Sequence, residues 1–392
     1  MPDAQAVKDD DYVTKILGLL DQLGGPSPEE SVVSTETPSP APLTTGELAA
    51  RIFDREVDTE WRRTSYSGLI RVQEQPVGVT SEAEVDVLDD EDDDPTEPDA
   101  GGPEASSPTR VSVPSPMAAL PSGATFGSLV HGVLEESDPE APDLRAELAM
   151  HAREQLQWWP VGVGADELAD ALLPSQLTPL GAPASGLRLV DIPVRDRLCE
   201  LDFEFPLTGG DRPDAVRPEV RLGDVGPLLA AHLSADDPLA PYAGQLTGVL
   251  GEQSLRGYLS GSIDVVLRVP GDPGEPHSHR YVVVDYKTNL LGETGVPVTS
   301  ADYGHAEMAG AMLHSHYPLQ ALLYSVVLHR YLRWRLPSYS PEHHLGGVLY
   351  LFLRGMCGPE TPVVDGHVAG VFDWAPPAAL VTELSDLLEG SS

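Results

Sequence analysis

The sequence predicts a mixed α/β fold with a central sheet flanked by helices. Residues 197–207 (RLCELDFEFPL) alternate between apolar and polar side chains, as a half-buried strand does. Two more strand-like runs, 258–269 and 281–289, are separated by the turn-forming PGDPGEPHSH. A long helical pattern at 317–336 then precedes a further apolar strand at 346–355. Strands that are mixed with helices in this way are typical of layered α/β folds.

The chain divides by composition into five segments. Residues 1–43 form a flexible N-terminal segment that ends in a Ser/Thr/Pro run. Residues 44–72 hold a helix that starts with a Thr/Glu capping box, followed by WRRTSYSGLIRV. Residues 73–118 are acidic and rich in proline, and we expect a disordered insertion there. Residues 119–386 form the main domain, and 387–392 form a tail.

Helices begin the main domain. The stretch ATFGSLVHGVLEE (124–136) has one apolar helical stripe with His131 beside it. The stripe consists of Phe126, Leu129, Val130, Val133 and Leu134. Residues 143–159 and 166–174 also have helical patterns.

The composition limits the possible functions. A net charge of −38 disfavours broad electrostatic binding to nucleic acid, so any contact with DNA must be local. The two cysteines have no CxxC spacing, which fits a reducing, cytoplasmic location. The motif GxxxxGK(S/T) is absent, so we expect no ATPase or helicase motor in this chain. There is no signal-peptide pattern and no apolar run of about 18 residues, so we expect no membrane association.

Lysine usage draws attention to one position. The chain has three lysines, and Lys287 is the only one that follows Lys15. Nearly all other positive charge is arginine, which could have served equally well on the surface. The retention of lysine at this position therefore indicates a chemical role.

Two strands bring acidic side chains next to this lysine. Residues two apart on a strand face the same way, so Asp285 and Lys287 project together. If a hairpin joins the two strands, Asp264 lies within about 5 Å of Asp285. Two carboxylates at that distance repel by about 3 kcal/mol at an effective dielectric near 20. A divalent cation would remove this repulsion, and oxygen ligands of this kind select Mg²⁺.

This arrangement suits the hydrolysis of phosphodiesters. A hard cation withdraws charge from phosphate oxygens and lowers the pKa of a bound water. A lysine beside it either orients that water or stabilises the charge that develops on the phosphate. The alternative is a pair of strand carboxylates with an incidental lysine, because D-x-K tripeptides are common.

Several blocks of the sequence, in the same order, resemble a known nuclease family. They are WRRTSYSGL, LPSGATFGSLVHGVLE, GYLSGSIDVV, YVVVDYKTNLLG, YPLQALLYSVVLHRYLRWRL and EHHLGGVLYLFLRG. Together they resemble the C-terminal nuclease domain of RecB, the β subunit of exodeoxyribonuclease V, in the PD-(D/E)xK nuclease superfamily. The resemblance implies a restriction-endonuclease-like fold on which residues 44–72 pack. It also implies a Mg²⁺-dependent deoxyribonuclease that acts in double-strand-break repair and recombination.

The resemblance also implies roles for individual residues. Asp264, Asp285 and Lys287 match the catalytic residues of the family. His131 matches the histidine of its G-x-x-x-H helix and would ligate the metal together with both aspartates and the backbone carbonyl of Tyr286. From the residues alone, a single histidine on a helix is more often a structural residue.

Other candidates have open alternatives. Glu200 matches an upstream glutamate of the family, but it shares a predicted strand face with Asp202 and Glu204, and a solvated face explains it equally well. The candidates for DNA binding are Gln320, Tyr324, Arg330, Arg333 and Arg354. Gln320 and Tyr324 match a family Q-x-x-x-Y motif and are otherwise ordinary helix surface. For the arginines, a set of charges at the end of a helix is the alternative.

The resemblance implies partners as well. DNA is the expected substrate, and one or more helicase subunits of a RecBCD-like complex are expected partners, because the family's motor is missing from this chain. The chain is then either a fragment of a longer polypeptide or a separate subunit. A different reading is a nuclease-fold module with little catalysis that docks partner subunits or a recombinase. A restriction-type endonuclease is a third.

Overall fold

The computed structural model describes most of the chain from residue 112 onward and a short stretch before it. The described residues are 61–71, 112–210, 219–271, 279–293 and 295–390, and all of them belong to one compact unit, Asp58–Ser392. The predicted segment 1–43 and the capping-box helix that starts at Thr44 lie outside these residues.

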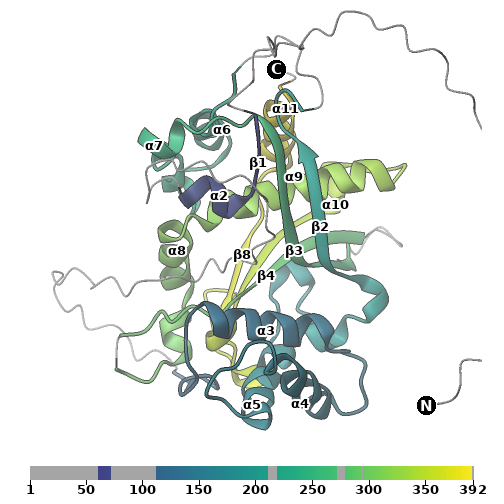
Figure 1. Ribbon diagram of the computed structural model, residues 1–392, viewed down its shortest axis with the longest axis vertical. Coiled ribbons are helices and arrows are strands. Elements are labelled where there is room, and N and C mark those ends of the chain that lie inside the picture. Colours follow the sequence, from purple (N-terminus) through teal and green to yellow (C-terminus); the bar gives the residue numbers. More distant parts are fainter. Residues whose placement is uncertain (1–60, 72–111, 211–218, 272–278, 294, 391–392) are drawn as a thin grey trace, which may run out of the picture. The chain divides into compact units, whose positions relative to one another are not determined.

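A six-stranded mixed sheet forms the centre of the fold (Figure 1). Its strands are β1 (Arg62–Thr64), β2 (Arg197–Pro206), β3 (Gly257–Pro270), β4 (His279–Lys287), β5 (Leu345–Phe352) and β8 (Val371–Trp374). β3 pairs antiparallel with β2 and β4 and parallel with β1, while β5 pairs parallel with β4 and antiparallel with β8. The predicted mixed α/β class, the hairpin β3–β4 and the strand after the long helix are confirmed.

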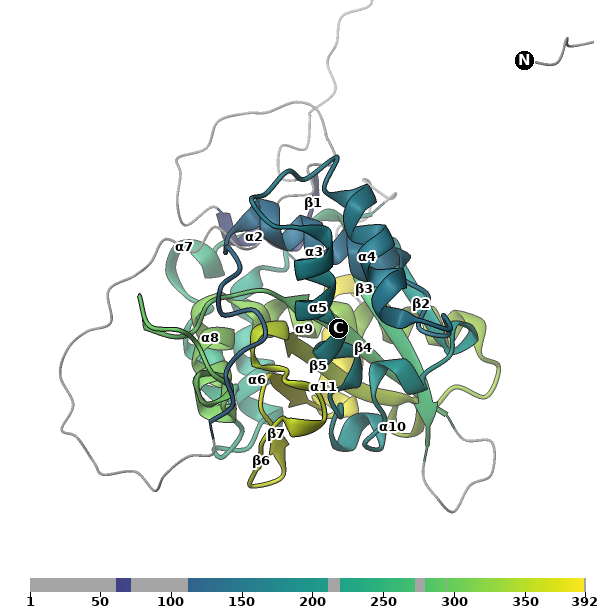
Figure 2. The ribbon, with the colours of Figure 1, turned by 90° about the horizontal axis from the view of Figure 1, so that it is seen from below.

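Helices cover both faces of this sheet and form two hydrophobic cores. The helices are α2 (Tyr66–Ile70), α3 (Ala124–Glu136), α4 (Leu144–Gln155), α5 (Ala165–Leu177), α6 (Val225–His232), α7 (Gly248–Gly251), α8 (His305–His314), α9 (Tyr317–Arg335), α10 (Pro341–His344) and α11 (Ala378–Glu389). α3, α4 and α5 lie together in both views and contribute to one core (Figures 1 and 2). α6, α8, α9 and α11 contribute to the other.

β5 shows how the sequence encodes two cores. Val348, Tyr350 and Phe352 point into the core with α9, whereas Leu349 and Leu351 point into the core with α3. A strand that is buried on both faces needs a continuous apolar run, which VLYLF supplies. α9 is similarly buried along most of its length, which explains why it has no broad polar face.

Two predicted boundaries are wrong. The composition of residues 112–118 predicts that they belong to the disordered insertion, but Met117 is fully buried and the N–H of Ser115 donates to the carbonyl of Val298. Likewise, α11 continues to Glu389 with Leu388 buried, so the tail begins later than 387. Composition and position along the chain do not reveal the apolar contacts that order these two segments.

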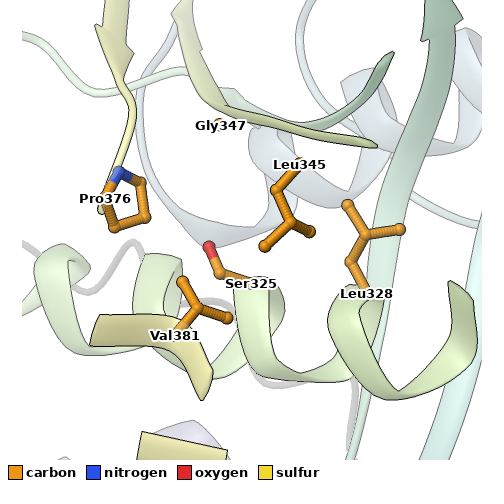
Figure 3. A pocket seen from close by; sticks show the side chains of 6 residues that line it. All are labelled: Ser325, Leu328, Leu345, Gly347, Pro376 and Val381. Atoms are coloured by element: carbon orange, nitrogen blue, oxygen red, sulfur yellow. The ribbon is translucent and has the colours of Figure 1, made fainter. Parts of the chain in front are cut away.

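A small pocket lies between α9, α11 and β5 (Figure 3). Its lining residues are Ser325, Leu328, Leu345, Gly347, Pro376 and Val381. Its volume is about 10 Å³, which is roughly the space that one water molecule needs. The Ser325 hydroxyl donates to the Ala321 carbonyl, so no reactive group is free in it.

Among the described residues, no helix has both the length and the hydrophobicity to cross a bilayer.

Candidate active site

The candidate site begins where β3 and β4 stop pairing. Their ladder ends at the pair Val265–Val284, and Asp264 and Asp285 are the next residues on the two strands. The side chain of Asp264 is 14% exposed and that of Asp285 is 3% exposed. The hairpin therefore places the two aspartates that the sequence singled out at facing positions on neighbouring strands, close enough for their charges to interact.

His131 reaches this point from α3. Its Nδ1 lies 3.5 Å from Asp264 Oδ2, and its Nε2 lies 2.9 Å from the carbonyl oxygen of Tyr286. The N–H of Tyr286 in turn donates to Asp264 Oδ2 at 2.8 Å. The apolar stripe of α3 is buried against the sheet, and His131 at the edge of that stripe consequently faces the strand ends.

Lys287 and Asp285 form a buried ion pair. Lys287 Nζ lies 3.0 Å from Asp285 Oδ2, as expected for two residues on one strand face. The ammonium also lies 4.1 Å from the ring centroid of Tyr317 and 5.8 Å from that of Tyr350. The carboxylate and the aromatic faces together offset the loss of hydration of this lysine, which is only 4% exposed.

The two aspartates differ in their ionisation. Burial raises the pKa of Asp285 to about 7, and repulsion from Asp264 adds to this shift, while Lys287 opposes it. Burial also acts to raise the pKa of Asp264, but His131 and the N–H of Tyr286 outweigh it, and the pKa falls below its ordinary value. One carboxyl of the pair therefore ionises easily, whereas the other needs additional positive charge nearby.

Glu200 interrupts the regular alternation of β2. Residues two apart on a strand normally share a face, yet Cys199 packs in the core with α3 and Leu201 packs against the core with α9. The φ of Glu200 is +44°, a left-handed value that costs an L residue about 1 kcal/mol or more. This backbone conformation reverses the direction of the side chains along the strand.

The reversal separates Glu200 from its predicted neighbours. Asp202 and Glu204 are exposed, as expected for a solvated face, but Glu200 is half-buried and its Oε2 accepts a hydrogen bond from Ser262 Oγ at 2.8 Å. Burial, followed by repulsion from Asp264, raises its pKa to about 7. A third carboxyl therefore lies within electrostatic range of Asp264.

The donors in this cluster fit a divalent cation. They comprise two carboxylates, one imidazole nitrogen and one backbone carbonyl. His131 Nε2 and Tyr286 O are hydrogen-bonded at 2.9 Å, and this distance is also compatible with the roughly 3 Å between adjacent ligands of an octahedral ion. Asp285 Oδ2 is buried and accepts no well-aligned hydrogen bond among the described residues, although Lys287 Nζ is near. Such an oxygen is suited to ligate a metal.

Gln320 and Tyr324 are buried, so they are not part of the exposed surface of α9. Gln320 is 3% exposed, accepts a hydrogen bond from Tyr350 at 2.8 Å, and donates to Tyr324 at 3.2 Å. The Tyr350 hydroxyl also donates to the carbonyl of Tyr317 at 3.3 Å. The two residues therefore belong to a buried network that supports the rings around Lys287.

The three candidate arginines have different environments. Arg354 is 1% exposed and donates to backbone carbonyls, so a direct phosphate contact by this residue conflicts with the structure. Arg330 is largely buried and donates to the side chain and backbone of Ser385. Arg333 is half-exposed and pairs with Glu389 at 3.2 Å, so it is the member of the set with access to a ligand.

The sequence patterns did not reveal the tyrosine rings that lie against Lys287. Tyr317 covers Lys287, and its hydroxyl exchanges hydrogen bonds with the side chain of Asn289. Tyr317 lies one helical turn before Gln320, and Asn289 lies two residues after Lys287. These spacings place both residues near the lysine, and they are the signal that could have found them.

Comparison with known proteins gives a consistent result. No model of a protein family matches the chain. RecBCD enzyme subunit RecB of Mycolicibacterium smegmatis is 57% identical over 389 residues, which are 98% of this chain and 34% of that protein. RecBCD enzyme subunit RecB of Mycobacterium tuberculosis H37Rv is 54% identical over 97% of this chain and 33% of that protein. The same subunit of Escherichia coli K12 is 31% identical over 89% of this chain and 25% of that protein.

The chain spans about a third or less of the length of these relatives. High identity over nearly all of this chain nevertheless leaves one assignment: the chain is a homologue of RecB, matching a segment that makes up about one third of that subunit.

Proposed function

We propose that the chain is a Mg²⁺-dependent deoxyribonuclease, the nuclease part of a RecBCD-like helicase–nuclease in double-strand-break repair and recombination. The observation that carries this proposal is the cluster of Asp264, Asp285, Lys287 and His131 at the end of the β3–β4 ladder. Asp285 is buried and Asp264 is mostly buried, and their pKa values are shifted in opposite directions beside a buried lysine. Such a set of charges costs folding free energy, and it is typical of a functional site such as a metal site.

We further propose that the fold is of the restriction-endonuclease type, in the PD-(D/E)xK superfamily. The support is the mixed sheet with helices on both faces and the D-x-K sequence on β4, next to an aspartate on the antiparallel neighbour β3. Metal-dependent hydrolysis of a phosphodiester needs such groups close together, and the point where β3 and β4 stop pairing is where these residues lie.

In this proposal Asp264, Asp285, His131 Nε2 and the carbonyl of Tyr286 hold the magnesium ion. When bound, the ion draws charge from a phosphate oxygen and makes a water molecule more acidic. Asp264 accepts from the N–H of Tyr286 and lies near His131 Nδ1, so it helps to hold the imidazole in place. Nε2 is hydrogen-bonded to the Tyr286 carbonyl, and a bound ion would replace this hydrogen bond. Lys287, held by Asp285 and Tyr317, orients the attacking water or stabilises charge on the phosphate.

The acidic composition shapes the proposed binding of DNA. With a net charge of −38, contact with DNA must be local and steeply dependent on salt. Arg333, with Arg335 and the 76% exposed Trp334 beside it, offers the charge and the ring that nucleic acid binding uses. We propose that a helicase subunit supplies the remaining affinity and delivers the strand to the site.

The test is the degradation of linear DNA in the presence of Mg²⁺ by the wild type and by Asp285→Asn and Lys287→Met. We expect both variants to lose more than about 100-fold in rate, a typical cost of removing a group that stabilises charge in the transition state. Asp236→Asn, a carboxylate on the exposed loop after α6, is the matched control and should keep full activity.

A docking module with little catalysis is the second candidate. The acidic charge and the internal hydrogen bonds of Arg330 and Arg354 favour it, because both reduce the affinity of the isolated chain for DNA. In that case it would dock partner subunits or a recombinase, and Asp285→Asn would leave any residual nuclease activity unchanged. Loss of activity in Asp285→Asn with retention in Asp236→Asn would exclude this function as the main one.

A further inference from the structure

A second cluster of metal-ligating side chains lies away from the β3–β4 ladder. It consists of His305, the first residue of α8, His367 on β7 (His367–Val368), and Asp373 on the edge strand β8. One ligand atom from each of these residues lies within 4.8 Å of the other two. β7 forms a short hairpin with β6 (Val363–Val364), which projects from the rest of the fold in Figure 2, and β7 contacts β8.

The contacts within this cluster are close. His367 Nδ1 lies 3.3 Å from Asp373 Oδ1. The rings of His305 and His367 are stacked with centroids 3.8 Å apart and planes 18° apart. On the sheet side, His305 also stacks with Phe372, at 5.2 Å and 13°. The start of α8 and two strands that are close together in sequence, β7 and β8, therefore bring together two imidazoles and one carboxylate.

One of these imidazoles has an unused polar atom. His305 Nδ1 is buried, and it has no hydrogen-bond partner among the described residues. Buried polar atoms without a partner are rare in folded proteins, and each calls for an explanation such as a bound water or ion. The stacking of two imidazoles would also place like charges together if both were protonated, so the pair is suited to the neutral form that binds metals.

We propose that His305, His367 and Asp373 form a binding site for a transition-metal dication, with Zn²⁺ as the best match. Two imidazoles and one carboxylate are a typical ligand set for Zn²⁺, whereas Mg²⁺ prefers sites in which most of the ligands are oxygens. All three side chains are partly exposed, so water can complete the coordination. The site is thus distinct in chemistry from the oxygen-rich cluster around Asp264.

Binding requires one local adjustment. In nearly parallel stacked rings the nitrogen lone pairs lie in separate, nearly parallel planes, so one imidazole must rotate about its Cβ–Cγ bond before both can point at a shared ion. His367 is the ring that can do this, because it lies on the short hairpin and is 37% exposed, while His305 is held against Phe372. The positive end of α8 opposes a cation there, and the Asp373 carboxylate offsets it.

A bound ion would connect the β6–β7 hairpin to α8 and to the edge strand. Among the described residues, the hairpin itself has a ladder of two residue pairs, and Val363 and Val364 are exposed. Such a short hairpin has little stability of its own. A metal bridge would therefore hold it in place without contributing to the proposed chemistry of the main site.

The experiment is a Co²⁺ titration of the EDTA-treated, untagged 392-residue chain, followed by the visible absorption of the ion. Co²⁺ is the spectroscopic stand-in for Zn²⁺. We expect saturable absorption in the wild type and in Asp285→Asn. His367→Ala and Asp373→Asn should each weaken the affinity for Co²⁺ by at least about tenfold. Even the loss of a residue that only supports a metal ligand typically weakens binding by about that factor. His343→Ala, a histidine in α10 outside the cluster, is the matched control.

Two outcomes would overturn the proposal: equal Co²⁺ affinity in the wild type, His367→Ala and Asp373→Asn, or loss of the absorption in Asp285→Asn alone. Thermal unfolding in EDTA checks that the variants fold. If His367→Ala unfolds, His305→Gln replaces it, with the same loss of affinity expected and retained affinity contradicting the proposal. Nuclease assays are not needed, so a failed Co²⁺ site and a failed nuclease assignment are told apart.

Discussion

Arg354 provides a sharp prediction because its structural role and a DNA-contacting role have opposite consequences. Its guanidinium donates to the carbonyls of Thr288 at 2.7 Å and Met117 at 2.8 Å, and also to those of Leu120 and Pro121. It therefore ties the segment before α3 to the residue that follows Lys287. Substitution by methionine keeps much of the volume but removes every one of these donors.

The expected cost can be worked out from these contacts. Hydrogen bonds to a charged group contribute about 1.5–3 kcal/mol each, but removing a buried guanidinium also removes its desolvation penalty. We expect Arg354→Met to lower the free energy of unfolding by about 3–5 kcal/mol, as for other broken buried charge networks. With a urea slope of about 3 kcal/mol/M, the midpoint should fall by roughly 1–2 M.

Urea unfolding followed by circular dichroism measures this change. Arg333→Met is the control, because Arg333 is half-exposed and its ion pair with Glu389 contributes at most about 1 kcal/mol. An Arg354→Met midpoint equal to that of the wild type, combined with weaker DNA binding and a smaller salt dependence, would refute the structural role.

Two further substitutions test the packing of α9 and the pairing of β1 with β3. Burial lowers the pKa of His329 to about 4 from an ordinary 6.5, so the folded state binds fewer protons than the unfolded state between these values. The contribution of His329 to the free energy of unfolding should therefore fall by about 3 kcal/mol as the pH drops from 6.5 to 4, and His329→Asn should flatten the pH dependence of the melting temperature. An unchanged profile would contradict this. Gly257 has a φ of +108°, and an added Cβ would collide with the backbone of Arg62 on β1. Gly257→Ala should lower the free energy of unfolding by about 2–4 kcal/mol in urea, whereas a wild-type midpoint would show that the β1–β3 pairing tolerates the side chain.

The centre of the site could be predicted because it depends on local periodicity. Asp285 and Lys287 share a face through the two-residue repeat of a strand, and a hairpin is the simplest way to join β3 and β4. His131 is different, because α3 precedes β3 by more than a hundred residues. Only the resemblance to RecB-type nucleases indicated that this histidine reaches the strand ends.

The rest could not be predicted because it depends on long-range contacts. Arg354 follows an apolar strand, and its carbonyl partners come from residues 117–121, part of which had the composition of a disordered insertion. The reversal at Glu200 needs a left-handed φ that a glutamate rarely adopts, so the alternating pattern predicted the wrong face. The pairing of His305 with His367 arises from tertiary packing alone.

The central claim is that Asp264, Asp285, His131 and Tyr286 together bind a divalent cation. Its most direct test is anomalous diffraction from crystals of the chain soaked in Mn²⁺, which takes similar oxygen-rich sites to Mg²⁺ and scatters anomalously. We expect an anomalous difference peak within about 2.3 Å of both carboxylates, His131 Nε2 and the Tyr286 carbonyl oxygen. A map at saturating Mn²⁺ with no peak between β3, β4 and α3 would contradict it.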